Sequence, residues 1–170
     1  YGRQFSIDDF DFGENLAPAK TSLDKELLQE LLQADYYGSN EFHQLQNQIE
    51  KLAPADIWAI PVLTTALRRE GSAFVISPLV VEGLGNIGPA AHTAIPAILD
   101  TSMAGAAILE DRIEPITKAL QKIDPEGEYI LPELPLFEKR HYTAGARHVS
   151  KKILLKLKGQ AVEEALKKYE

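Results

Sequence analysis

The chain of 170 residues has no cysteine, one tryptophan, one methionine and no apolar run that approaches the length of a membrane span. Without cysteine, disulfide bonds and a thiol nucleophile are excluded. A bilayer crossing needs about 20 consecutive apolar residues, so the sequence predicts no membrane segment, and it shows no signal-peptide pattern. What is present, 45% apolar and 25% charged residues, indicates a soluble globular chain. We expect a cytoplasmic location and, because the chain begins at Tyr1, a truncated or processed N-terminus.

A short phrase recurs four times along the chain. It begins at Ile49 (IEKLAP), Leu84 (LGNIGP), Leu120 (LQKIDP) and Leu154 (LLKLKG), at spacings of 35, 36 and 34 residues. An aliphatic residue followed by proline comes eleven residues after the start of each of the first three phrases. Glycine or a following proline ends a helix, and proline is tolerated in the first turn of the next. Each repeat is therefore a helix, a tight turn and a second helix.

A period of this length is typical of stacked helix pairs. We predict an all-α fold, a right-handed α-solenoid of about four helix pairs, with an irregular segment at 1–22 and a helical repeat domain at 23–170. Pro78 and Pro115 lie within helical patterns, where each is expected to kink its helix or delay its start. The expected helices are 23–34, 41–52, 57–69, 74–84, 93–100, 108–123, 129–139, 144–156 and 161–169.

The stretch 84–99, LGNIGPAAHTAIPAIL, resembles the HEAT-repeat family in its bacterial and bilin-lyase-like form. The other three phrases are similar to that family by position and residue class, so the resemblance covers about 42–170. It implies a stack whose concave face is formed by the second helices of the repeats. The family usually carries an arginine seven residues before the leucine of the phrase, paired with an aspartate of a neighbouring repeat. Only Arg147 stands there, so we expect mostly apolar packing between repeats.

We interpret the chain as a noncatalytic protein-interaction or scaffold module that binds a protein partner on this concave face. Two alternatives stay open: a chromophore-handling subunit similar to the bilin lyases, and a structural spacer within a larger protein. No catalytic, cofactor or metal site is expected, because the four histidines are scattered over three repeats. The motif Gly83-Leu-Gly-Asn-Ile-Gly88 matches a dinucleotide fingerprint, but Pro78 interrupts the strand that such a site needs.

The residues expected to contact a partner are mostly cations near the second helices. They are Arg68, Arg69, His92, Lys139, Arg140 and Arg147. Arginine is enriched at interface hot spots, which favours the pair Arg68 and Arg69. An alternative reading of these two is that they pair with the negative end of their own helix. Trp58 is interpreted as core or turn packing.

Charge is unevenly distributed along the sequence. Residues 1–41 carry nine acidic and three basic side chains, whereas residues 139–170 carry three acidic and nine basic ones. This asymmetry favours self-association between the acidic N-terminal and the basic C-terminal regions. It disfavours nucleic acid as a partner, because most of the chain would repel phosphates. The basic end is also consistent with the solvated face of an amphipathic helix.

The first 21 residues have no helical period. Aromatic residues alternate there with acidic ones, namely Tyr1, Phe5, Phe10 and Phe12 with Asp8, Asp9, Asp11 and Glu14. Such a segment is typical of a mobile tail. The sharper hypothesis is a strap that docks, on its own chain or a neighbour, against a groove or the basic C-terminal end.

Overall fold

The computed structural model describes residues 23–69, 73–104 and 107–170 of the chain. These parts are mostly helical, as the sequence predicts, with one small hairpin. The helices are α1 (Lys25–Gln33), α2 (Ser39–Glu50), α3 (Ala59–Leu67), α4 (Ala73–Ile87), α5 (Ile95–Asp100), α6 (Glu110–Ile123), α7 (Ile130–His141), α8 (Ala144–Lys156) and α9 (Gln160–Leu166), with 3₁₀ turns η2 (Pro89–Ala94) and η3 (Lys167–Tyr169). The segment 1–22 and its expected irregular structure lie outside the described residues.

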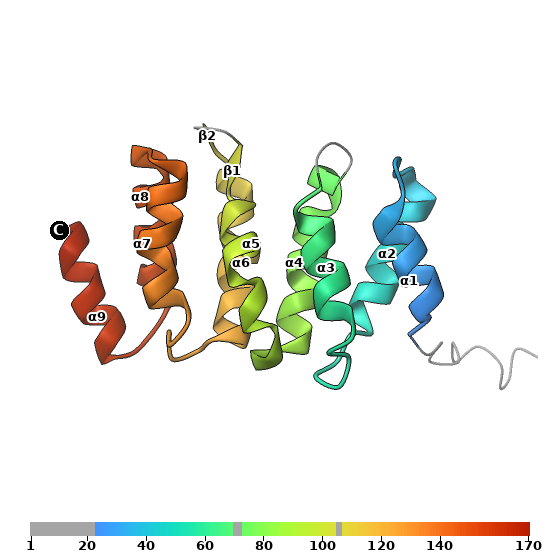
Figure 1. Cartoon of the computed structure of the whole chain (residues 1–170), viewed down its shortest axis with the longest axis horizontal. Helices are drawn as coiled ribbons and strands as arrows, with labels where there is room; N and C mark the ends of the chain where they lie inside the picture. Colours follow the sequence, from blue (N-terminus) through green and yellow to red (C-terminus); the bar gives the residue numbers. More distant parts are fainter. Residues whose placement is uncertain (1–22, 70–72, 105–106) are drawn as a thin grey trace, which may run out of the picture.

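The helices stand side by side in chain order along the long axis of the molecule (Figure 1). Packing contacts sort them into two rows: α2, α4, α6 and α8 form the first row, and α1, α3, α5 and α7 form the second row. Each helix touches its neighbours in its own row, while α9 packs on α8. The chain enters each first-row helix at the upper edge of the molecule in Figure 1. It turns into the next second-row helix at the lower edge.

Helix ends follow the local signals of the sequence. The carboxylate of Asp24 accepts a hydrogen bond from the backbone N–H of Leu27 at 3.0 Å and caps α1. The hydroxyl of Thr143 does the same for α8, accepting from Ala146 N at 3.2 Å. Gly88, with φ of +83°, ends α4 in a conformation that side chains rarely adopt.

The turn between α6 and α7 is organised by Asp124, which is buried. Its carboxylate accepts hydrogen bonds from the backbone N–H groups of Glu128 at 2.9 Å and of Tyr129 and Ile130, both at 2.8 Å. A negative charge at a helix N-terminus is favourable. One side chain therefore fixes the direction in which α7 leaves the turn.

The core between the rows is a continuous layer of aliphatic side chains. The phrase residues Ile49, Leu84, Leu120 and Leu154 are all at most 1% exposed. Each first-row helix contributes the first residue of the recurring phrase to the core. These buried side chains therefore form a row along the molecule with the period of the sequence. Apolar packing between successive pairs is thus as expected.

Polar side chains add a ladder that the sequence reading did not include. Asn86 donates a hydrogen bond to the carbonyl of Ile49 at 3.2 Å and accepts one from Lys122 at 3.3 Å. Gln121 donates to the carbonyl of Lys156 at 2.8 Å. These bonds join the C-terminal ends of adjacent first-row helices, where backbone carbonyls lack partners inside the helix. The Asp–Arg ladder that the resemblance implied would lie elsewhere, since its arginine stands seven residues before the leucine of the phrase, as Arg147 does.

Two expectations about local structure need correction. Two short strands, β1 (Met103–Ala104) and β2 (Ala107–Ile108), pair in antiparallel fashion, with Met103 opposite Ile108. The sixth expected helix therefore begins at Glu110 and not at 108. Pro78 and Pro115 do not delay their helices, since α4 and α6 each begin five residues earlier. Each proline is the sixth residue of its helix, where its missing N–H removes one hydrogen bond to the fourth residue before it, and the helix continues past it.

Candidate functional site

Arg69, one of the expected partner contacts, binds its own chain. Its guanidinium Nη1 donates a hydrogen bond to the carbonyl of Leu32 at 2.6 Å, and Nη2 lies 3.5 Å from a carboxylate oxygen of Asp35. The bond to Leu32 satisfies a carbonyl in the last turn of α1. The neighbouring Arg68 is exposed. A hollow of ≈ 270 Å³ lies between α1 and α3, with Arg69 in its wall.

Arg140 makes a similar connection between α7 and α5. Its guanidinium donates to Glu133 at 2.7 Å and to Asp100 at 3.2 Å. Burial opposes the charge, but these hydrogen bonds outweigh it and raise the pKa of Arg140. His141 also meets Asp100, with its Nε2 2.7 Å from the carboxylate. The aspartate at the end of α5 is therefore held by two side chains at the end of α7.

Arg147 lies at the C-terminal end of the molecule and contacts η3. Its Nη2 donates to the carbonyl of Lys168 at 2.7 Å, and its guanidinium carbon lies 5.0 Å from the ring centre of Tyr169. The hydroxyl of Tyr169 hydrogen-bonds Glu138. Burial and this hydrogen bond raise the pKa of Tyr169 to about 12. The expected partner residue Arg147 thus fastens the last turn to α8.

His92 and Lys139 complete the expected set. The imidazole of His92 stacks on the ring of Tyr129, with ring centres 4.2 Å apart, and its Nδ1 lies 3.1 Å from the carbonyl of Pro89. Lys139 is exposed. Trp58 donates to Asp56 at 3.3 Å and packs on the core at the start of α3, as interpreted from the sequence. The six expected contacts are spread over the molecule and do not meet in one site.

The glycine motif has a packing explanation at each glycine. A Cβ on Gly83 would lie 2.9 Å from Leu52, and one on Gly85 would lie 3.0 Å from the Cα of Ala119. The two glycines therefore let α4 approach α2 on one side and α6 on the other. Gly88 supplies the turn described above. This is the arrangement of a packed helix and its end, as the sequence analysis concluded.

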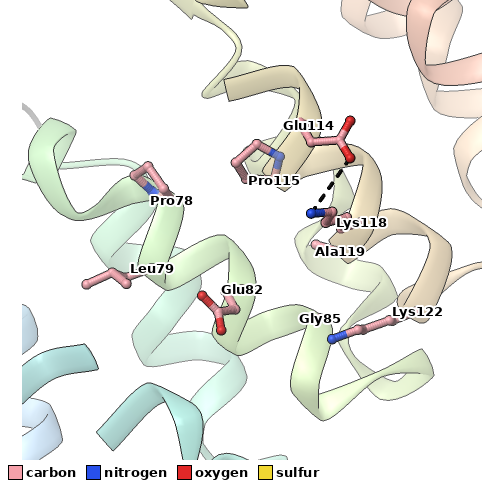
Figure 2. A pocket seen from close by; sticks show the side chains of 9 residues that line it. All are labelled: Pro78, Leu79, Glu82, Gly85, Glu114, Pro115, Lys118, Ala119 and Lys122. Atoms are coloured by element: carbon pink, nitrogen blue, oxygen red, sulfur yellow. Dashed lines mark ion pairs between the residues drawn. The ribbon is translucent and has the colours of Figure 1, made fainter. Parts of the chain in front are cut away.

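A groove of ≈ 360 Å³ lies between α4 and α6 in the first row. Figure 2 shows the two helices converging toward Gly85 and Ala119, with Pro78 and Pro115 at the wider end. Pro78, Leu79 and Pro115 give the groove an apolar wall. The close contact at Gly85 closes its narrow end, so the groove is open toward the prolines and toward solvent.

Charged side chains surround this apolar wall. Glu82 lies on α4, and Glu114, Lys118 and Lys122 lie on α6 (Figure 2). Glu114 and Lys118 form an ion pair of 3.7 Å in which both side chains are largely exposed. Such pairs contribute little to stability, so these charges are available to reorganise around another molecule. The rim carries both signs of charge.

Sequence reasoning did not identify the groove. It assigned binding to the second helices, whereas the groove belongs to the first row. A signal was present in the sequence. Two successive first helices each carry a proline, Pro78 or Pro115, and further along the same helix a small residue, Gly85 or Ala119. Only the packing of α4 against α6 shows that these four residues share one surface.

A second hollow of ≈ 670 Å³ lies at the N-terminal end of the described chain, between α1 and α2. Its lining consists of Leu23, Asp24, Lys25, Glu26, Leu27, Gln44, Asn47, Gln48 and Lys51. We call it the α1–α2 hollow. Polar and charged side chains dominate its wall, and Leu23 and Leu27 are its apolar members.

Over 23–69, 73–104 and 107–170, three or more histidine, aspartate and glutamate side chains nowhere gather in a way that would hold a metal ion. Within the same ranges, none of the helices combines the length and the apolar character that a bilayer crossing requires. Comparison with protein-family models, with curated proteins and with solved structures found no significant match to this chain.

Proposed function

We propose that this chain is a HEAT-like α-solenoid. Three observations support the proposal: the helices form two rows, each helix packs on its neighbour in the same row, and equivalent residues in the first row recur at intervals near 35. Hydrogen bonds between adjacent first-row helices span similar separations, as in the 37 residues from Ile49 to Asn86. A stack in which each pair meets only its neighbours is the physical definition of a solenoid.

We further propose that the solenoid is a noncatalytic module that binds a protein partner, and that the groove between α4 and α6 is its binding surface. The groove combines an apolar wall with a charged rim, which is the usual anatomy of a protein interface. Its size suits one or two apolar side chains of a partner segment. The rim charges of Glu82 and Lys118 then select the flanking residues.

This proposal places the partner on the first row. The expected site on the second helices has less to offer, because Arg69, Arg140 and Arg147 are bound within the chain. Recruiting them for a partner would break hydrogen bonds that join one helix to another. Arg68 and Lys139 are exposed and stay candidates for contacts at the edge of an interface.

The chromophore-handling alternative requires a roomy groove with aromatic walls and an arginine for the propionates. Among the described residues that line the three hollows none is aromatic, and the one arginine, Arg69, donates to Leu32. We therefore propose protein binding alone. A structural spacer needs no binding groove. The peptide-selection experiment described next therefore also tests the spacer alternative.

A peptide-selection experiment tests the proposal. A library of displayed peptides is selected on the full chain and counter-selected on a Glu82→Arg, Lys118→Glu variant, which reverses two exposed rim charges without entering the core. Selected peptides should carry an apolar anchor flanked by charges. Their affinity, measured by fluorescence anisotropy, should fall at least about tenfold in the variant, which corresponds to about 1.4 kcal/mol.

The matched control is Glu50→Arg, which makes the same type of charge change on α2, in the same row but away from the groove. It should leave the affinity unchanged. Peptides that bind wild type, rim variant and control equally would place the binding surface elsewhere. A selection that enriches no peptide would count against the module and favour the spacer.

A further inference from the structure

The α1–α2 hollow occupies a defined position in the arrangement of helices. Its four lining residues from α2 are Gln44, Asn47, Gln48 and Lys51, and the groove residues of α6 that lie 71 residues later are Pro115, Lys118, Ala119 and Lys122. This separation is two repeats of the sequence. On α6 these four positions face α4, the preceding helix of the first row. The same positions on α2 therefore face the place of a preceding first-row helix.

Helix α1 supports this assignment. It lies in the second row, next to α3, and its contact with α2 is a contact between the rows. In the following pairs, each second-row helix is preceded in the chain by a first-row helix, as α3 is by α2 and α7 by α6. The chain that precedes α1 is the segment 1–22. The segment precedes α1 in the chain as a first-row helix precedes each later second-row helix. The hollow lies where such a helix would pack against α2.

We propose that residues 1–22 of the same molecule pack into the α1–α2 hollow, in the place that a first-row helix before α1 would take. The segment carries Phe5, Phe10 and Phe12, which have large apolar surfaces. The hollow offers Leu23 and Leu27, both only partly buried by the rest of the chain. Burial of aromatic rings against these leucines supplies the driving force.

The length of the segment permits this packing. Leu23 itself lines the hollow, so the segment begins at its edge. The chain from Leu23 back to Phe12 can extend up to about 35 Å, more than the reach required. In an extended chain Asp9 and Asp11 would lie on the side opposite Phe10 and Phe12, so that these two aspartates can stay in water while the two rings turn inward.

Two docking places for the segment are expected from the sequence, a groove and the basic C-terminal end, and the α1–α2 hollow corresponds to the first. The basic C-terminal region attracts the acidic segment by charge, yet α8 and α9 lie at the far end of the molecule from α1 (Figure 1). The hollow is adjacent and matches by register. Its own rim carries Asp24 and Glu26 with Lys25 and Lys51, so that the two signs balance. A segment of modest negative charge meets no strong repulsion there.

Because the chain has no cysteine, pairs of introduced cysteines report the position of the segment. Asp8→Cys keeps all the phenylalanines and lies on the same side of an extended chain as Phe10 and Phe12; it is combined with Asn47→Cys in the hollow, with Glu82→Cys at the α4–α6 groove, or with Leu155→Cys on α8. All three partner positions are exposed. The effective concentration of each pair is measured in a glutathione redox buffer, with products sized on non-reducing gels.

We expect the effective concentration of the Asn47 pair to exceed those of both other pairs by at least about tenfold, with a product of monomer mass. A higher value for the Glu82 or Leu155 pair would move the segment to the groove or to the basic end. A product of twice the monomer mass would place the segment on a second molecule. Equal values for all three pairs would show that it does not dock, and each of these results overturns the proposal.

Thermal unfolding of full chains without cysteines gives a second readout. A Phe10→Ser, Phe12→Ser variant should lower the Tm by about 5 °C, because the rings lose their burial in the hollow. The control is Tyr36→Ser, which removes an aromatic ring that is 78% exposed and should change the Tm little. An equal Tm for the wild type and the double phenylalanine variant would refute the packing.

Discussion

Replacing Asp124 tests how strongly one buried carboxylate organises the turn between α6 and α7. The residue is 4% exposed, and its carboxylate accepts three backbone hydrogen bonds, from Glu128 and Tyr129 just before α7 and from Ile130, its first residue. Removal of an N-terminal capping side chain costs about 0.5–2 kcal/mol, and a buried donor left without a partner costs about 1–3 kcal/mol. Since the N–H of Ile130 is buried, Asp124→Ala should lower the free energy of unfolding by about 3 kcal/mol.

Thermal and urea unfolding followed by circular dichroism measure this loss. For a chain of this length, about 3 kcal/mol corresponds to a fall in Tm of about 6–12 °C. Asp124→Asn should cost less, about 1 kcal/mol. Its amide oxygen can replace Oδ2, which accepts from Tyr129 and Ile130, while its NH₂ group opposes the N–H of Glu128.

The control is Asp56→Ala in the turn between α2 and α3, which also leads from the first row to the second. Asp56 accepts one backbone hydrogen bond, from Ala53 at 2.9 Å, at an exposed site, so its loss should cost under about 1 kcal/mol. The reasoning is refuted if Asp124→Ala is no more destabilising than Asp56→Ala. It is also refuted if the alanine and asparagine variants of Asp124 unfold alike, because the number of retained acceptors would then not matter.

The remaining predictions concern two residues that join elements distant in sequence. Arg69→Met should lower the free energy of unfolding by about 1–2 kcal/mol because the carbonyl of Leu32 loses its donor, whereas Arg68→Met next to it should change it by less than about 0.5 kcal/mol; equal effects in urea unfolding would contradict the assigned role of Arg69. Tyr169 should titrate with a pKa of about 12 in the folded protein against its ordinary value of 10.0, which the ultraviolet absorbance difference between wild type and Tyr169→Phe measures. A pKa raised in the folded state means that the neutral phenol is stabilised, so this contribution is complete below pH 10 and is lost as the pH rises toward 12. A stability difference between wild type and Tyr169→Phe that stays constant over this pH range would contradict the proposed burial.

The helices were predictable because their signals are local. Amphipathic spacing, prolines in first turns and the phrase that recurs near every 35 residues are properties of short segments, and the helices expected between 23 and 169 are found with small shifts of their ends. The strand pair β1–β2 was missed because two-residue strands carry no period. Its position depends on a tertiary contact instead: a Cβ on Gly145 in α8 would lie 2.9 Å from the side chain of Ile108.

The candidate site was not predictable in the same way. From sequence, Arg68 and Arg69 are equivalent neighbours, and the tertiary structure alone decides that Arg69 reaches a carbonyl 37 residues away while Arg68 stays exposed. The groove likewise depends on how closely α4 meets α6 at Gly85 and Ala119. The sequence by itself determined which segments are helical and in what order they pair, because those choices depend on neighbours in the chain. Which charges are bound and which surfaces stay open was decided by contacts between helices, because those distances exist only once the helices are packed.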